Sequence, residues 1–228
     1  MTSIRTIFLA LISIWLLALP EPVRSQSQSE LNEQATRSVE KADLKLNKIY
    51  KEVVAKYSAN QIFTSKLRTS EAAWIGYRDA HLKSIFPADK PFDEYGSAYT
   101  LCYQVELLAQ TNKRSEQLAA ISNACKIDLA TAESQFKAEE LQLNTTYEQA
   151  STKIAPKYLR YLREAESEWR AFRDAESDAL ATLGSSKNRE VIRLNSRTSL
   201  DTARVKELNS WVTGFEEGNV CCGSRPVR

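Results

Sequence analysis

The chain has 228 residues, of which 43% are hydrophobic and 26% are charged, with a formal net charge of +2. This composition is typical of a globular protein and excludes wholesale disorder, which needs fewer apolar residues and a larger net charge. The near-neutral charge argues against a nucleic-acid-binding protein and against one held to membranes by a polybasic surface.

The N-terminal segment has the pattern of a cleaved signal peptide. Arg5 supplies a positive start, and Ile7–Leu19 is an apolar run broken only by Ser13. The small residues at the −3 and −1 positions, Val23 and Ser25, make cleavage after Ser25 acceptable. The alternative is a membrane anchor, but the run is shorter than the roughly 20 apolar residues of a spanning helix. We expect residues 1–25 to be removed, leaving a periplasmic or secreted protein without a stable membrane anchor.

The rest of the chain has the patterns of α-helices. Apolar residues spaced by threes and fours predict helices over residues 30–57 and 62–85, and the Pro and Gly residues of segment 87–96 predict a loop. Segment 97–155 contains no Gly or Pro, which leaves open a break near Ser122 and Asn123 or one very long helix.

The last helices follow the same spacing rule. Pro156 suits the first turn of a helix, Gly184 begins a turn with two serines, and the final apolar stripe ends at Phe215. No β-type alternation is sustained, so the sequence predicts an all-α fold. We expect residues 216–228 to form a flexible C-terminal tail.

A repeat is visible by direct comparison. Residues 71–80 read EAAWIGYRDA and residues 166–175 read ESEWRAFRDA. Other elements recur in the same order: Leu46-Asn47-x-x-Tyr50 with Leu143-Asn144-x-x-Tyr147, Gly96-Ser97 with Gly184-Ser185, and Arg114-x-x-x-Leu118 with Arg204-x-x-x-Leu208. Two tandem three-helix repeats, over residues 26–120 and 121–215, explain this order, and together they form an elongated helical bundle.

From Gln28 to Leu118 the pattern resembles the LprI-like lysozyme-inhibitor domain of bacterial envelope proteins, whose most specific motif is W-x-x-Y-R-D-A. The second repeat is similar but degenerate, with Phe172 for the Tyr and Asp201 where a Thr is expected. Two cysteines that are usual in the family are replaced by Gln34 and Leu82. The resemblance implies a helical fold and, because some members inhibit c-type lysozyme, a protein partner.

The motif residues have two interpretations. Aromatic residues at helical spacing usually fill cores, so Trp74 and Tyr77 are expected to be structural. The alternative is a recognition patch of aromatic, Arg and Asp side chains, as at interface hot spots. The candidate binding residues are Trp74, Tyr77, Arg78, Asp79, Trp169, Phe172, Arg173 and Asp174. The candidate structural residues are Asn47, Tyr50, Asn144, Tyr147, Gly96 and Gly184.

Four cysteines are disulfide candidates in an exported protein: Cys102, Cys125, Cys221 and Cys222. Cys102 with Cys125 is one pairing, and either member of the adjacent pair could instead bond an upstream cysteine. Their connectivity stays open at this stage. No C-x-x-C spacing supports a zinc or thioredoxin-type redox site.

Catalysis has little support in the sequence. There is no G-x-S-x-G, H-E-x-x-H or Gly-rich phosphate loop, so we expect neither an enzyme nor a cofactor or metal. The single histidine, His81, is interpreted as a surface or boundary residue, and the charged residues of segment 160–178 as a solvated helix face.

The leading hypothesis is an exported binding protein that blocks c-type lysozyme by protein–protein contact. The near-neutral charge weakens this hypothesis, because an inhibitor of a basic enzyme is expected to be acidic. The alternative is a non-inhibitory structural or adaptor protein that binds another protein or a cell-wall component. A hydrolase that acts on wall glycan is a third, less favoured hypothesis.

Overall fold

The structure is a computed structural model that describes residues 26–121 and 127–227. Over these ranges it is all-α, as predicted, apart from one isolated bridge between Phe215 and Val227. The long helices are α1 (Gln28–Lys56), α2 (Gln61–Ile85), α4 (Tyr99–Ala119), α5 (Leu129–Lys153), α6 (Leu159–Ala181) and α7 (Arg189–Thr213). The short ones are α3 (Pro91–Tyr95) and the 3-10 turns η1 (Gly96–Ala98) and η2 (Pro156–Tyr158).

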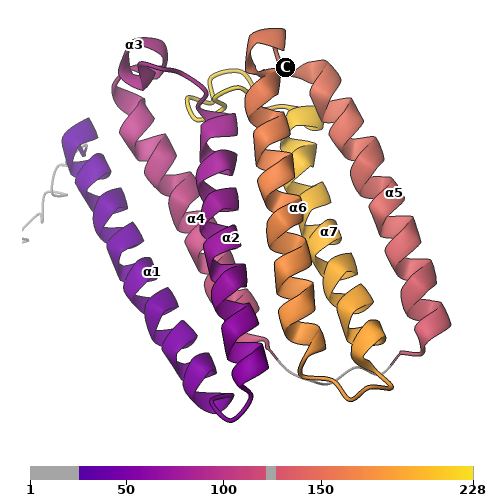
Figure 1. Cartoon of the computed structure of the whole chain (residues 1–228). Coiled ribbons are helices and arrows are strands. Elements are labelled where there is room, and N and C mark those ends of the chain that lie inside the picture. The colour runs from indigo at the N-terminus through magenta and orange to yellow at the C-terminus, as the bar shows by residue number, and fades with distance from the viewer. Residues whose placement is uncertain (1–25, 122–126, 228) are drawn as a thin grey trace, which may run out of the picture.

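Two three-helix units follow one another, which confirms the tandem repeat. Helices α1, α2 and α4 form the first unit, and α5, α6 and α7 form the second. The motif helices α2 and α6 pack side by side at the centre, whereas α1 packs on α4 and α5 packs on α7 towards the edges (Figure 1). The two repeats therefore meet through the same helix of each.

Polar side chains at three helix starts satisfy backbone N–H groups that lack helical partners. Ser27 and Glu30 form a capping box at α1, Asn60 caps α2, and Asp128 caps α5. Helix α4 ends at Ala119 and α5 begins at residue 129, so one continuous helix does not join the repeats. The break predicted at Ser122 and Asn123 lies outside the described residues.

The predicted loop of segment 87–96 contains helix α3, which is a correction. Pro91 begins this helix, where its missing N–H breaks no helical hydrogen bond. The helix ends at Tyr95, and the next residue, Gly96, has a φ of 64° in the left-handed region that glycine adopts without strain. Pro91 and Gly96 therefore bound a short helix within the segment that was expected to be an open loop.

The hydrophobic core is one cluster that both repeats share. Several of its large members come in pairs from equivalent positions of α2 and α6, because these two helices present their apolar stripes to each other. Of the helices that the structure describes, none combines the length and apolarity needed to cross a membrane. The paired core residues include Leu67 with Leu162, Trp74 with Trp169, and Tyr77 with Phe172.

A disulfide joins Cys102 of α4 to Cys221 of the C-terminal segment. This is one of the pairings that the sequence left open, and it excludes a bond between Cys102 and Cys125 in this structure. Cys125 itself lies outside the described residues. Within those residues Cys222 has no sulfur partner.

The C-terminal segment, expected to be a flexible tail over residues 216–228, is instead packed on the first repeat. The backbone N–H of Ser224 donates to the carbonyl of Ile85 at 2.7 Å. Arg225 is 7% exposed and pairs with Glu106 of α4 at 2.7 Å. The disulfide and these bonds fix the segment, which composition alone could not indicate.

Candidate functional site

The aromatic residues of the motif lie in the interface between the repeats. Trp74 and Tyr77 are 4% and 3% exposed, and Trp169 and Phe172 are each 2% exposed. The rings of Tyr77 and Phe172 are parallel, with an interplanar angle of 1° and centroids 6.0 Å apart. Such burial supports the structural interpretation of all four aromatic residues.

Arg114 of α4 is buried and binds carboxylates from both repeats. Its guanidinium forms a bidentate pair with Glu176 of α6, at 3.0 and 2.9 Å, and its Nε donates to Glu71 of α2 at 2.9 Å. Ser70 adds a hydrogen bond to Glu176 at 2.5 Å. Burial alone would raise the pKa of Glu176, but Arg114 and Ser70 hold that pKa below its ordinary value.

Arg204 of α7 is the repeat equivalent of Arg114 and also contacts side chains of both repeats. Its Nε donates to Glu166 of α6 at 3.2 Å, and its Nη1 donates to the hydroxyl of Tyr77 on α2 at 3.2 Å. Tyr77 in turn donates to Glu207. Burial raises the pKa of Tyr77 well above its ordinary value, so this hydroxyl keeps its proton.

His81 is 3% exposed, so its interpretation as a surface or boundary residue is wrong. Its Nδ1 lies 3.2 Å from Nη1 of Arg204, in the position that Glu176 takes beside Arg114 in the other half of the interface. Burial lowers the pKa of His81 to about 3, although Glu207 opposes this shift. The imidazole is therefore neutral at physiological pH.

The second repeat has a buried ion pair that the first repeat lacks. Arg173 is 5% exposed and its Nη1 lies 3.3 Å from Asp201, which is fully buried. One oxygen of Asp201, Oδ2, has no hydrogen-bond partner among the described residues. Burial outweighs Arg173 and raises the pKa of Asp201 to about 6. At the equivalent place the first repeat has Thr111, whose hydroxyl bonds its own helix.

The other motif polar residues are at least partly exposed. The side chains of Arg78 and Asp79 are 23% and 59% exposed and pair with each other at 2.8 Å, while Asp174 is 48% exposed. Arg78 also lies over the ring of Trp74, 5.3 Å from its centroid. Of the eight candidate binding residues, only these three therefore have side chains open to contact with a partner.

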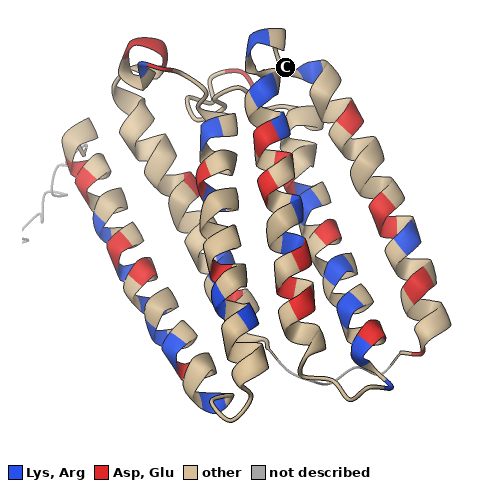
Figure 2. Ribbon diagram, in the orientation of Figure 1, with Lys and Arg blue, Asp and Glu red and all other residues tan. Residues whose placement is uncertain are grey.

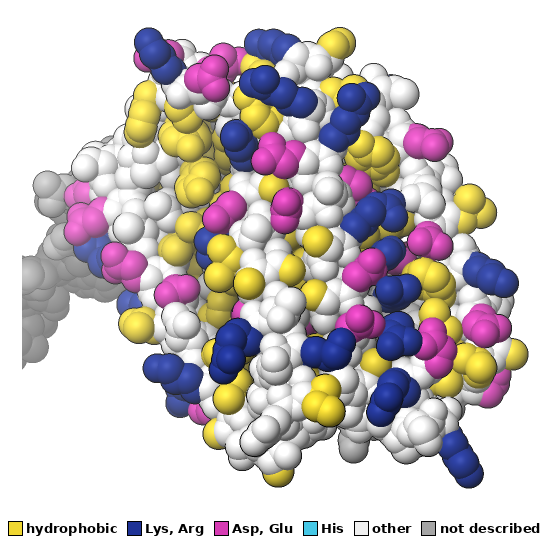
Figure 3. Space-filling view, in the orientation of Figure 1, with side chains coloured by type: hydrophobic (Ala, Val, Ile, Leu, Met, Phe, Trp, Pro, Cys, Tyr) yellow, Lys and Arg dark blue, Asp and Glu magenta, His cyan; other side chains and the backbone are white. Residues whose placement is uncertain are grey.

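An aromatic cluster lies on the first repeat at the end where α3 and α4 meet. The centroid of Tyr99 lies 5.4 Å from Phe92, 5.6 Å from Phe86 and 5.7 Å from Tyr103. Phe92 is 61% exposed, and Figure 3 shows hydrophobic side chains gathered below α3 between α1 and α2. We call Phe92, Tyr95, Tyr99 and Tyr103 the aromatic patch.

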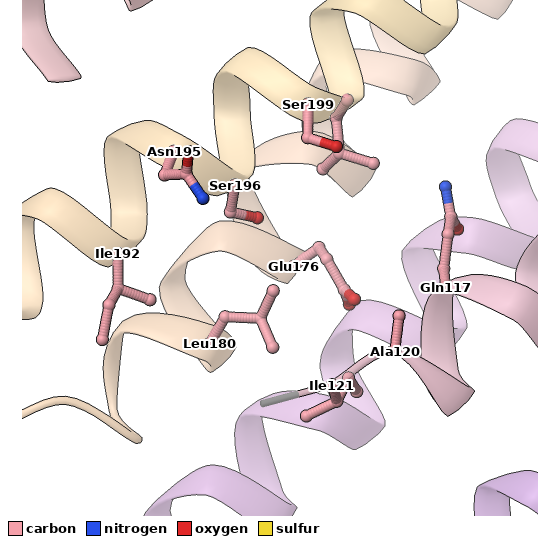
Figure 4. Close-up of a pocket in the computed structure, with 10 residues that line it drawn as sticks. Gln117, Ala120, Ile121, Glu176, Leu180, Ile192, Asn195, Ser196 and Ser199 are labelled. Atoms are coloured by element: carbon pink, nitrogen blue, oxygen red, sulfur yellow. The ribbon is translucent and has the colours of Figure 1, made fainter. Parts of the chain in front are cut away.

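A groove separates α4 from α7, because each of these helices packs on an outer helix of its own repeat. One end of this groove is a pocket of about 280 Å³, in which the carboxylate of Glu176 points towards the centre (Figure 4). The other end is a larger hollow of about 680 Å³ that includes His81. The two ends are thus lined by the repeat-equivalent residues Glu176 and His81.

The candidate structural residues have different surroundings in the two repeats. Asn47 is exposed and bonds Asp43 of its own helix, whereas Asn144 accepts a hydrogen bond from Arg170 of α6 at 2.9 Å. Tyr50 and Tyr147 are partly buried against the core. At Gly184 a Cβ atom would lie 2.6 Å from Ile192, so the close packing of the turn accounts for this glycine.

Charged residues on α6 were expected to form a solvated face, and three of them are buried: Glu166, Arg173 and Glu176. Figure 2 shows both signs of charge interleaved along α6 and α7. The recurrence of Arg114 as Arg204 and of Glu71 as Glu166 could have identified these buried polar contacts from the sequence, because side chains present in both copies of a repeat often make equivalent contacts. No group of three or more His, Cys, Asp or Glu in the described residues could hold a metal ion.

Comparisons with known proteins agree with this architecture. A search of the curated proteins found no match. A crystal structure of an uncharacterised protein from Burkholderia thailandensis is similar, with a TM-score of 0.58 and 16% identity, over 83% of this chain and 90% of that chain. At this identity the likeness shows the fold alone.

The family model described as lysozyme inhibitor LprI matches residues 21–118 and again residues 122–208. The two matched ranges correspond to the two three-helix units, and each contains one copy of the buried aromatic motif. The chain therefore belongs to the LprI lysozyme-inhibitor family and contains two tandem copies of the family's domain.

Proposed function

We propose that this protein is exported and inhibits c-type lysozyme by protein–protein contact, without catalysing a reaction. The observation that carries the proposal is the match of the lysozyme-inhibitor family to both repeats, which together make up nearly all of the helical body. The apolar N-terminal run Ile7–Leu19 and the disulfide between Cys102 and Cys221 are consistent with export.

The exposed part of the motif in the first repeat is the contact surface that we favour. Arg78 and Asp79 lie at the edge of the aromatic patch, since both charges act on the hydroxyl of Tyr103. Tyrosine and arginine side chains supply rigid, amphipathic contact area and are enriched at interface hot spots. A rigid, amphipathic surface of this kind suits contact with a folded protein. We expect it to cover the cleft of that partner.

A lysozyme assay with the purified mature chain tests the proposal. Clearing of a bacterial cell-wall suspension by c-type lysozyme should slow as micromolar protein is added, and unchanged clearing would overturn the inhibitory function. The charge reversal Asp79→Lys should weaken inhibition, because it changes the exposed carboxylate of the first repeat. The matched control is Asp174→Lys, which reverses the equivalent carboxylate of the second repeat, away from the aromatic patch.

The near-neutral charge favours a second candidate function, a non-inhibitory adaptor in the cell envelope. A dedicated inhibitor of a basic enzyme is expected to be acidic, and this chain has a formal net charge of +2. Lysozyme activity that stays unchanged, together with another envelope protein or wall fragment recovered on the immobilised chain, would favour the adaptor.

A further inference from the structure

The hollow of about 680 Å³ between α4 and α7 has the size of a small-molecule site. Helix α4 contributes Gln110 and Lys113 to its wall, α7 contributes Thr202 and Lys206, and His81 of α2 lies at its floor. Both repeats therefore build it, and neither repeat contains it alone. None of the motif residues proposed to contact lysozyme lines this hollow.

The negative charges of the hollow are already used by protein groups. Glu207 accepts hydrogen bonds from Gln110 at 3.2 Å, Lys113 at 2.7 Å and Arg204 at 3.2 Å, and it accepts a fourth from Tyr77. Four bonds fill the acceptor capacity of a carboxylate. The other carboxylate of the hollow, Glu106, is paired with Arg225 at 2.7 Å. A ligand therefore meets carboxylates that are neutralised.

Donor groups remain unused in the same hollow. The guanidinium of Arg204 has no acceptor atom, so its contact with Nδ1 of His81 requires Nδ1 to accept and the ring proton to lie on Nε2. No acceptor for that Nε2–H lies within hydrogen-bond distance among the described residues. Lys206 is exposed and forms no ion pair with a described carboxylate. Lys113 bonds only Glu207 and keeps further donor capacity.

We propose that this hollow binds a carboxylated sugar, with the carboxylate held by Lys206 and Lys113 and a ring oxygen held by Nε2–H of His81. The surplus of donors and positive charge selects an anion over a neutral ligand. The hydroxyl of Thr202 and the amide of Gln110 suit sugar hydroxyls, which both donate and accept. This inference is independent of lysozyme inhibition.

An NMR titration of the full chain tests it, with N-acetylmuramic acid as the probe. His81 is the single histidine of the chain, so its ring-proton signals identify one site without ambiguity. N-Acetylmuramic acid should shift these signals in a saturable way, whereas N-acetylglucosamine, which lacks the carboxylate, should bind at least about tenfold more weakly.

Two lysine variants separate the hollow from non-specific charge. Lys206→Gln removes the exposed amine of the hollow and should weaken N-acetylmuramic acid about tenfold. Lys137→Gln removes an exposed lysine of α5 that does not line the hollow, and it should leave the affinity unchanged. The proposal is overturned if the His81 signals do not respond to the acid, if the neutral sugar binds equally well, or if Lys206→Gln binds like the wild type.

Discussion

Arg114 of α4 and Arg204 of α7 occupy equivalent places in the two repeats, and each crosses to the central helix of the other repeat. Arg114 reaches Glu176 on α6, and Arg204 reaches His81 on α2, the residue equivalent to Glu176. Duplication thus produced a two-fold arrangement of buried polar contacts. One half of this arrangement contains the carboxylate of Glu176 and the other the neutral imidazole of His81, so the two halves are chemically different.

Removal of Arg114 should destabilise the fold strongly, because it leaves the buried carboxylate of Glu176 and the partly buried carboxylate of Glu71 without their cation. We expect Arg114→Met to lower the free energy of unfolding by about 3–5 kcal/mol, measured by urea denaturation at pH 7. The control is Arg37→Met, which breaks an ion pair with Glu33 whose side chains are both mostly exposed, and stability should change little. Equal effects of the two variants would contradict the structural role of Arg114.

Trp74 should contribute to stability as a core residue. Trp74→Ala removes a side chain that is 4% exposed and leaves a cavity between the repeats, so we expect a loss of about 3–5 kcal/mol in the free energy of unfolding. Its neighbour Ile75 is 45% exposed, and Ile75→Ala serves as the control. A loss below about 1 kcal/mol for Trp74→Ala would instead indicate an exposed recognition residue.

Short-range patterns accounted for much of the fold. Apolar spacing of threes and fours located helix α2 almost to the residue, and the repeated W-x-x-Y/F-R-D-A motif identified α2 and α6 as equivalent helices. The aromatic residues of that motif, interpreted as core by their spacing, are buried. These features depend on contacts within one or two helical turns, which a sequence displays directly.

The features that the sequence could not indicate depend on contacts between residues far apart in the chain. His81 and Glu176 look like surface residues because their types usually are, and they are buried only because an arginine from the other repeat reaches them. Arg114 and Glu176 lie 62 positions apart, so no local pattern joins them. The same holds for Cys221, whose partner is 119 positions away.

Mild acidification should act on two buried groups in opposite directions. Asp201 holds a proton more tightly in the folded chain than in the unfolded chain, whereas burial keeps His81 from binding one. The folded pKa of Asp201 is about 6, whereas an unfolded aspartate has a pKa of about 3.9. Between pH 7 and pH 5 Asp201 therefore contributes about 1 kcal/mol of added stability on acidification, and the raised pKa of Glu71 acts in the same direction as Asp201. His81 has a folded pKa of about 3 and an unfolded pKa of about 6.5, so it binds a proton only in the unfolded state and removes about 2 kcal/mol over the same range. We expect the wild type to lose a little stability at pH 5.

Asp201→Asn isolates the contribution of Asp201, since an amide does not titrate. Urea unfolding at pH 7 and pH 5 should show that Asp201→Asn loses about 1 kcal/mol more stability on acidification than the wild type, because the opposing contribution of Asp201 is gone. The neighbouring carboxylate of Asp174 is 48% exposed, and Asp174→Asn should retain the wild-type pH effect. A wild-type response in Asp201→Asn would show that the buried carboxyl is ionised throughout this range.

The bond between Cys102 and Cys221 should stabilise the whole protein, because it closes a loop that contains helices of both repeats. Cys102→Ser, or reduction of the wild type, is expected to lower the free energy of unfolding by about 2–5 kcal/mol. Cys222→Ser is the control: it should keep wild-type stability and the same sensitivity to reductant. Peptide mapping of the oxidised chain should recover Cys102 linked to the peptide that contains Cys221. A link from Cys102 to Cys125 would contradict the structure, because it would release the C-terminal segment from α4.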